Sequence, residues 1–153
     1  MLNLYDELIA VTRAFQERGV EYAVCGGMAM AIHSIPRNTV DLDLLIRRED
    51  LEQAEEIAMQ LGYTFKARPM KFDGGTVEIH RISKIDPDTH DPLMLDFLLV
   101  TPAVEDVWAA REVLRLEDGA ISVVSREGLI KLKSSRLSER DIEDIRLLRG
   151  EGE

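Results

Sequence analysis

The amino-acid sequence predicts an α/β (α+β) fold in which a small, mixed and twisted β-sheet is flanked by helices. Three observations support this prediction. Amphipathic segments with helical spacing alternate with short apolar segments of strand length. Glycine, proline and aspartate separate these segments, as turns require. The chain has 153 residues, of which 45% are hydrophobic, which is enough for one hydrophobic core. We therefore expect a single domain over residues 1–153, with C-terminal helices over residues 126–149.

The first half of the chain is expected to alternate between helix and strand. Residues 2–18 place Leu4, Leu8 and Val11 on one face of an amphipathic helix, and Gly19 ends it. The elements that follow are predicted to be a strand at 21–25, a short helix at 28–33, a strand ending at 46, a helix at 48–61, a broken strand at 63–72, a turn at 73–75 and a strand at 76–82.

The second half is expected to start with a surface loop at 84–92. This loop is acidic, but it lacks the glycine and the distal glutamate of an EF-hand. The predicted elements after it are a strand at 93–100, a helix at 102–111, a hairpin of 112–116 and 120–124, a helix at 126–134 and a final helix after Ser138. The residues expected to cap helices by their side chains are Asp50, Thr101, Ser125 and Ser138.

Two aspartates stand out in the strand that ends at Ile46. Alternate residues of a strand share a face, so Asp41 and Asp43 are expected to lie side by side. The residues around them are apolar, which predicts a strand buried on both faces. Two carboxylates in such a place repel each other and lose hydration unless a cation neutralises them. Mg²⁺ is a suitable cation, since in phosphate chemistry it is usually held by one or two carboxylates and the substrate's phosphates.

A glycine pair, Gly26-Gly27, lies between the first predicted strand and the short helix. Glycine allows the backbone to come close to a ligand, and the free N–H groups at a helix start attract an anion. A tight turn with close packing of helix on sheet explains the same pair equally well.

The order of these features resembles a known superfamily. An apolar-Gly-Gly segment, a spacer of about one helix and Asp-apolar-Asp, read here as VCGGMAMAIH and RNTVDLDLLI, is similar to the nucleotidyltransferases of the DNA polymerase β type. The small members that it resembles are AbiEii-like toxins, minimal nucleotidyltransferases of toxin–antitoxin pairs and antibiotic nucleotidyltransferases. The resemblance implies a nucleotidyltransferase-like fold and transfer of an NMP group from an NTP, with Asp41 and Asp43 holding Mg²⁺, as one ion or two.

The resemblance also assigns roles to residues outside the aspartate pair. Arg37 and Thr39 fall in an Arg-x-Thr-x-Asp pattern, and a guanidinium at Arg37 could grip phosphate bidentately. The segments SREGLIKLK and RDIEDI resemble the C-terminal helices of the same small members. Lys131 and Lys133 lie on different helix faces, and Lys133 is the one expected to reach the triphosphate. Nucleotide contacts are thus expected at Gly26, Gly27, Arg37, Thr39 and Lys133.

A third carboxylate, Asp96, lies in the apolar strand LMLDFLLV. A charge there should not survive without a partner. One interpretation is an ion pair with a lysine or arginine elsewhere in the chain. The other is convergence on Asp41 and Asp43, where the family's third acidic residue shares the metal or takes the proton from the attacking hydroxyl.

The net charge and the composition of the chain indicate which acceptors and which surroundings to expect. The net charge is −10, which disfavours a polynucleotide unless a basic patch is present, so a small-molecule or protein acceptor is favoured slightly over tRNA. The single cysteine, Cys25, fits a core position and a reducing cytoplasm. No long apolar segment indicates a membrane span. The chain is short for a separate acceptor-binding domain, so a homodimer or a partner protein is expected to complete the acceptor pocket.

A second function remains open at this point. A non-catalytic interaction protein, such as the antitoxin-like half of a complex, could keep the same fold. Glu78, His80 and His33 carry no assigned role.

Overall fold

The computed structural model describes residues 2–35, 39–117, 119–134 and 139–150, and these residues form a mixed α/β structure with an eight-stranded sheet. The strands are β1 (Ala23–Cys25), β2 (Asp41–Ile46), β3 (Phe65–Lys66), β4 (Met70–Phe72), β5 (Val77–Ile85), β6 (Pro92–Leu99), β7 (Glu112–Leu116) and β8 (Gly119–Val123). The helices are α1 (Leu4–Glu17), α2 (Gly26–Ile32), α3 (Leu51–Gln60), α4 (Glu105–Ala109), α5 (Arg126–Ser134) and α6 (Glu139–Leu148), with short 3₁₀ turns at Arg48–Asp50, Asp73–Gly75 and Pro102–Val104.

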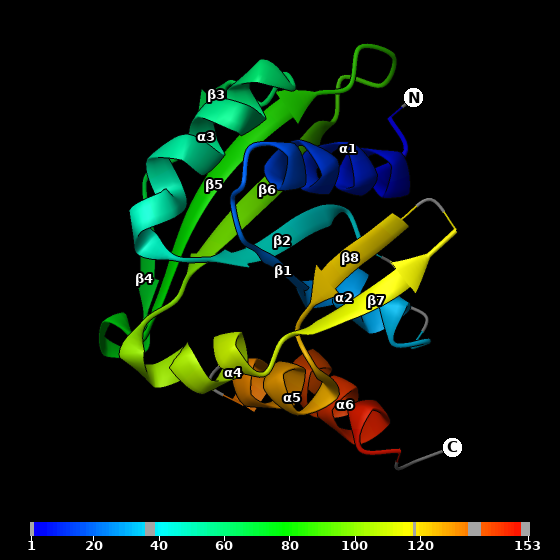
Figure 1. The fold of residues 1–153 in the computed structure, drawn as a ribbon, viewed down its shortest axis with the longest axis vertical. Coiled ribbons are helices and arrows are strands. Elements are labelled where there is room, and N and C mark those ends of the chain that lie inside the picture. The colour runs from blue at the N-terminus through cyan, green and yellow to red at the C-terminus, as the bar shows by residue number, and fades with distance from the viewer. Residues whose placement is uncertain (1, 36–38, 118, 135–138, 151–153) are drawn as a thin grey trace.

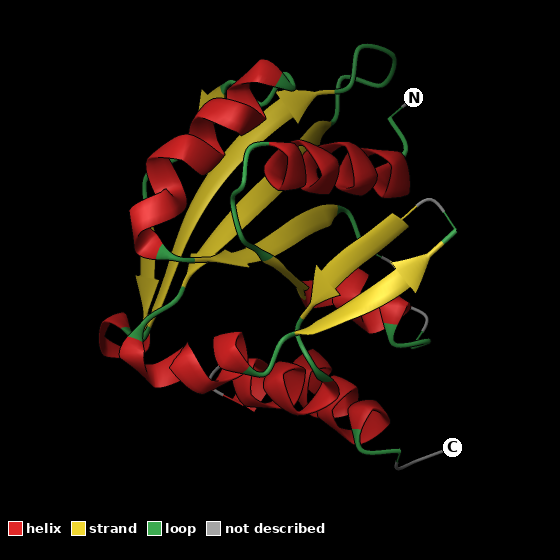
Figure 2. Cartoon of the chain, viewed as in Figure 1, coloured by secondary structure: helices red, strands yellow, loops and turns green. Residues whose placement is uncertain are grey.

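The sheet runs in the order β3-β5-β6-β2-β1-β8-β7, and β4 also pairs with β5. The β2–β6 and β1–β8 pairs are parallel, whereas the other strand pairs are antiparallel. Figure 2 shows the twist of this sheet from β5 to the β7–β8 hairpin. The predicted fold class is confirmed, including the mixed sheet and the hairpin of β7 and β8.

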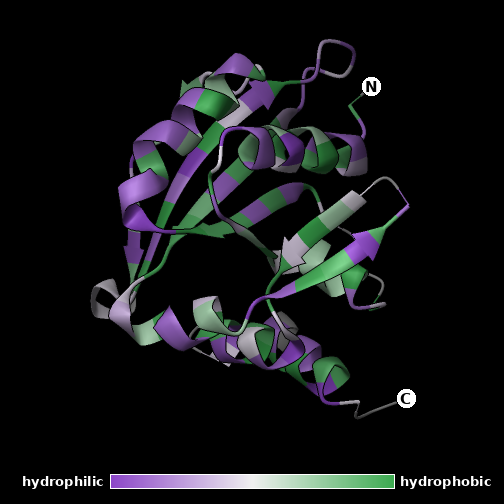
Figure 3. Cartoon of the chain, viewed as in Figure 1, coloured by the Kyte–Doolittle hydropathy of each residue, from purple (hydrophilic) through white to green (hydrophobic). Residues whose placement is uncertain are grey.

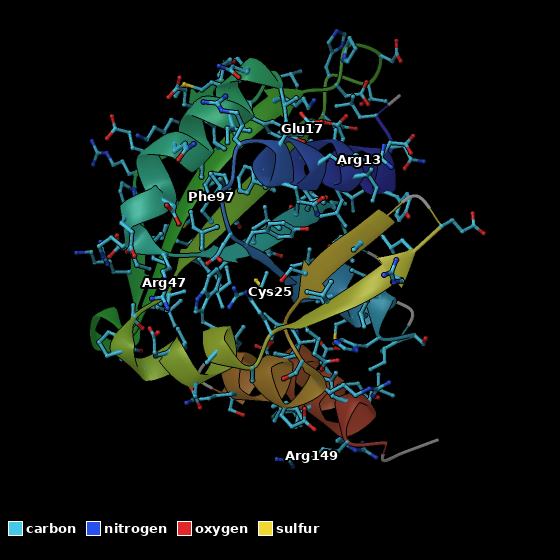
Figure 4. All side chains as sticks on the ribbon, viewed as in Figure 1. Arg13, Glu17, Cys25, Arg47, Phe97 and Arg149 are labelled. Carbon is cyan, nitrogen blue, oxygen red and sulfur yellow. The ribbon has the colours of Figure 1, made fainter. Side chains whose placement is uncertain are left out.

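Helices α1 and α3 cover one face of the sheet (Figure 1). Under α1, Leu44 of β2 and Phe97 of β6 (labelled in Figure 4) are fully buried. The ring of Phe97 stacks on Phe15 of α1 with centroids 6.0 Å apart. Along the first halves of β2 and β5, hydrophobic and hydrophilic residues alternate (Figure 3), as expected for strands whose two faces meet different surroundings. This face therefore holds much of the hydrophobic core and leaves the other face available for polar groups.

The other four helices lie outside the layer formed by α1 and α3. Helix α2 follows β1 directly and lies partly behind β7 and β8, while α4, α5 and α6 pack together at one end of the sheet (Figure 1). None of the helices in the described ranges combines the length and apolar composition needed to cross a bilayer.

Several local predictions changed. Helix α2 begins at Gly26 instead of after the glycine pair. Asp50 makes no side-chain cap, and the hydroxyl of Thr101 donates to the carbonyl of Thr76 instead of capping a helix. The cap at Ser125 is confirmed, since its Oγ accepts a hydrogen bond of 3.0 Å from the N–H of Gly128. Ser138 lies outside the described residues.

Candidate active site

One row of residues across four strands carries the polar centre of the sheet. In register, Cys25 of β1 pairs with Asp43 of β2, Asp43 with Asp96 of β6, and Asp96 with Arg81 of β5. Residues paired in this way point to the same face of a sheet. The buried Cys25 marks the end of β1 in Figure 4 and helps to find this row by eye.

The three predicted carboxylates share this face. Asp41 is two residues before Asp43 on β2, so both side chains point to the same side. Asp96 is the direct parallel neighbour of Asp43. Because neighbouring strands are about 4.8 Å apart, the structure brings the carboxylates of Asp41, Asp43 and Asp96 together. Along the chain, Asp96 lies 53 residues after Asp43.

Gly26 is where helix α2 meets the aspartates. Its φ is +66°, a conformation that L side chains rarely adopt, and a Cβ built there would lie 2.8 Å from Cγ of Asp43. Glycine is therefore needed here both for the backbone turn and for the close approach of the carboxylate.

Gly27 is needed for a similar reason. A Cβ there would lie 2.8 Å from Cβ of Thr39. The hydroxyl of Thr39 accepts a hydrogen bond of 3.4 Å from the N–H of Asp41, so the segment before β2 is tied to the first aspartate. Close packing of helix on sheet thus explains both glycines, and nucleotide contacts at Gly26, Gly27 and Thr39 stay predictions.

Asp41 has an unusual environment. Its Oδ1 is buried and finds no hydrogen-bond partner among the described residues. Burial, and then the negative charge of Asp96, raise the pKa of Asp41, while the positive charge of Arg81 partly opposes this rise. A buried carboxylate oxygen without a partner is costly, and a bound cation would satisfy it.

Arg81 is a member of this polar row that the sequence analysis did not single out. Its Nε and one terminal nitrogen donate to the two oxygens of Asp96 at 2.8 and 2.9 Å. The hydrogen bonds to Asp96 raise the pKa of Arg81, burial partly opposes this rise, and the charges of Asp96, Asp41 and Asp43 add to it, so the guanidinium lies in the field of the whole carboxylate group. The ion pair expected as one interpretation of Asp96 is present, and it lies beside Asp43.

Some of the carboxylate oxygens in this row are suitable ligands for a hard divalent cation. Across the described ranges, no three His, Cys, Asp or Glu side chains are arranged as a complete metal site. The open oxygen of Asp41 and the neighbouring carboxylate of Asp43 offer the one or two carboxylates that Mg²⁺ takes in phosphate sites. The oxygens of Asp96 are already engaged by Arg81.

Lys133 lies in a different environment from the one expected. The side chain is 6% exposed, and its ammonium is 2.9 Å from Asp144 and 3.9 Å from Asp141 of helix α6. This ion pair explains the burial of Lys133 without a nucleotide, so a triphosphate contact stays a prediction. Arg37 lies outside the described residues.

The three unassigned residues now have structural contacts. Glu78 pairs with Arg48 at 2.9 Å and with Nε2 of His80 at 2.7 Å, and these partners lower the pKa of Glu78 to about 2. Glu78 and His80 have the opposite parity to Arg81 on β5, so they face away from the aspartates. Nε2 of His33 lies 2.8 Å from the carbonyl oxygen of Val124 and holds the end of α2 near α5.

Comparison with solved structures shows the same fold in nucleotidyltransferases. A protein from Thermotoga maritima, described as a candidate nucleotidyltransferase, is 17% identical with a TM-score of 0.63, and the match covers 95% of this chain and 90% of that one. ANT(2″)-Ia, solved with adenylyl-2″-tobramycin, is also 17% identical with a TM-score of 0.63, over 95% of this chain and 87% of that one. No protein of curated function matches the sequence closely enough to count as a relative.

The sequence itself gives the family. A family profile described as "Uncharacterised nucleotidyltransferase" matches residues 1–131, which include the glycine pair and all three aspartates. The chain belongs to this family of nucleotidyltransferases.

Proposed function

We propose that this protein is a Mg²⁺-dependent nucleotidyltransferase that moves an NMP group from an NTP to a hydroxyl acceptor. The observation that carries the proposal is the buried Oδ1 of Asp41, which has no hydrogen-bond partner among the described residues. It belongs to the strand residue two before Asp43, where β2 meets the start of α2. Family membership and the shared fold support the transferase class.

Each residue has a defined role in this proposal. Asp41 and Asp43 hold the metal, which when bound supplies positive charge to the phosphate oxygens. The glycines let the start of α2 pack against Asp43 and Thr39, and the main-chain N–H groups there would orient the triphosphate beside the carboxylates. Asp96 accepts the proton of the attacking hydroxyl, and the fork of Arg81 holds its carboxylate in place.

The proposed reaction is an in-line displacement. The acceptor oxygen forms a bond to the α-phosphorus, the bond from that phosphorus to the bridging oxygen breaks, and pyrophosphate leaves. The hydroxyl proton goes to Asp96. The chain contributes mainly positioning and charge, as phosphoryl transfer usually requires.

We propose a small molecule or a protein as the acceptor, in preference to tRNA. A net charge of −10 repels polynucleotides. The neighbour ANT(2″)-Ia was solved with adenylyl-2″-tobramycin, which makes a small hydroxyl acceptor a sensible first test. A role in a toxin–antitoxin pair, a homodimer or partner protein and a cytoplasmic location are carried forward as predictions from the sequence.

Thermal unfolding with Mg²⁺ and each of the four NTPs tests the proposal. A ligand that binds only the folded state raises the melting temperature. We expect a Mg²⁺-dependent rise with at least one NTP in the wild type and none in Asp43→Asn. Asp106→Asn is the matched control, because Asp106 is an exposed aspartate on α4 that pairs with Lys131; it should respond as the wild type does.

The outcomes separate the two functions. Release of pyrophosphate with the responding NTP and a set of hydroxyl acceptors would support the transferase. An equal response in Asp43→Asn would contradict the proposed site. A folded wild type that responds to no NTP would favour the interaction protein instead.

A further inference from the structure

Both carboxylate oxygens of Asp96 accept hydrogen bonds from Arg81. Asp96 is 4% exposed, and Arg81 meets it with two parallel hydrogen bonds. Such a bidentate pair is among the stronger contacts that a carboxylate can make. Asp41, on the neighbouring strand, differs because its Oδ1 is open. The three carboxylates are therefore not equivalent ligands.

The position of Arg81 gives it influence over the whole site. It is the register neighbour of Asp96, which in turn is the register neighbour of Asp43. Its positive charge interacts with the charges of Asp96, Asp41 and Asp43, so it lies within electrostatic range of any cation that these carboxylates would bind. Two cations cannot share one carboxylate pair at close range without repulsion, and this repulsion is weakly screened in a partly buried site.

We propose that Arg81 is a resident counter-ion that competes with divalent metal for Asp96 and thereby sets the metal affinity and stoichiometry of the site. This inference rests on the proposed function, because it takes Asp41 and Asp43 as the metal ligands. With Arg81 in place, the site loads one ion on Asp41 and Asp43. A second ion binds at Asp96 when the Arg81–Asp96 pair opens.

Arg81 is placed so that the pair can open. Its side chain is 31% exposed, compared with 5% for that of Asp96, so the guanidinium has a path to solvent that the carboxylate lacks. A long side chain of this kind can keep its charged end hydrated after leaving its partner. Asp96, held in the strand, stays beside Asp43. Arg81 is therefore a positioning residue that acts through Asp96.

Binding of Mn²⁺ to the full chain without nucleotide tests this inference. Mn²⁺ prefers the same oxygen ligands as Mg²⁺, and free and bound Mn²⁺ can be counted by electron paramagnetic resonance. The variants are Arg81→Met, Arg81→Lys, Asp96→Asn and the double variant Arg81→Met/Asp96→Asn. Arg47→Met is the matched control, since Arg47 also pairs with a carboxylate through two nitrogens, at Glu105.

The expected results form a double-mutant cycle. Arg81→Met should bind Mn²⁺ about tenfold more tightly, or bind one more ion, because a competing positive charge is gone. Asp96→Asn alone should change the affinity by no more than about twofold, because Arg81 already occupies this carboxylate. In the Arg81→Met background, Asp96→Asn should remove the gain. Arg81→Lys should lie near the wild type, and Arg47→Met should match it.

An unchanged or weaker affinity in folded Arg81→Met would overturn the inference, as would a large loss in Asp96→Asn alone. If Arg81→Met fails to fold, Arg81→Gln takes its place, since its amide can still donate one hydrogen bond to Asp96. Loss of Mn²⁺ binding in Asp41→Asn with no effect at Arg81 would sink this inference and leave the proposed function standing. Absence of Mn²⁺ binding in the wild type and in every variant would contradict both.

Discussion

Asp43 and Asp96 lie directly opposite each other across the parallel strands β2 and β6. This register decides whether the site exists, because a slip of one residue would turn one of the two carboxylates to the other face of the sheet. The apolar residues on either side of Asp43 along β2 hold the register: Leu42 and Leu44 alternate with the aspartates and are fully buried. The hydrophobic core thus fixes the position of the polar groups on the opposite face.

Asp96→Asn should separate binding from turnover. The amide keeps the size of the side chain and a hydrogen bond to Arg81 but cannot take a proton. We expect kcat for NMP transfer to fall about 10²- to 10⁴-fold, as for loss of a general base. The melting-temperature response to Mg²⁺ and NTP should remain. Steady-state kinetics together with thermal unfolding check this, and unchanged kcat would remove Asp96 from the proton-transfer step.

Glu78→Gln should change stability in acid. Arg48 and His80 lower the pKa of Glu78 from its ordinary 4.5 to about 2. A carboxylate with a lowered pKa in the folded state contributes stability that is present above pH 4.5 and is lost as the pH falls towards 2. The variant should therefore show a flatter dependence of unfolding free energy on pH in this window.

The contacts of Glu78 determine the expected change in unfolding free energy and the choice of a control variant. Loss of hydrogen bonds to a charged group should cost about 1–3 kcal/mol at pH 7. Glu105→Gln is the control, because Glu105 pairs with Arg47 at an exposed position. Urea unfolding at several pH values measures both variants. An equal pH dependence in Glu78→Gln and the wild type would contradict the assignment.

Lys133→Met should destabilise the protein strongly. It removes the ammonium that offsets two buried negative charges, Asp141 and Asp144. Breaking a buried ion pair typically costs about 3–5 kcal/mol. Lys131→Met is the control on the same helix, since the exposed pair of Lys131 with Asp106 should be worth at most about 1 kcal/mol.

The result for Lys133 also bears on its predicted nucleotide contact. A structural role changes unfolding free energy and leaves the NTP affinity of the folded variant near that of the wild type. A phosphate contact would lower that affinity as well. Denaturant unfolding and nucleotide titration below the melting temperature distinguish the two roles.

The part of the candidate site around β2 could be predicted from the sequence because its signals are local. Asp41 and Asp43 share a face by the period of a strand, and Gly26-Gly27 precede them by one short helix. These features need no knowledge of which strands are neighbours. Asp96 was noticeable for a similar reason, since a charge within an apolar strand requires a partner.

Arg81 could not be identified in this way. Its role depends on β5 lying next to β6 in the sheet, and on the register that pairs it with Asp96. Periodicity gives the face of a strand but not its neighbour. The ion pair of Lys133 depends similarly on the packing of α5 against α6. The cap expected at Thr101 failed because a tertiary contact takes its hydroxyl, which donates to the carbonyl of Thr76. Asp50 does not cap α3 by its side chain, and its own backbone is already helical at the end of the 3₁₀ turn Arg48–Asp50.

Gly26→Ala should show that the aspartates depend on the start of α2. The residue has φ of +66°, and its Cβ would press on the Asp43 side chain. Gly19 is a matched control, because its φ is +73° and nothing lies within 4 Å of a Cβ there. Each change to alanine should cost about 1–2 kcal/mol for the backbone conformation. Gly26→Ala should cost more, since Asp43 must also move, and it should lose the Mg²⁺-dependent response to NTP that Gly19→Ala keeps. Equal unfolding free energies and equal responses in the two variants would show that the contact between Gly26 and Asp43 does not position the proposed metal ligands.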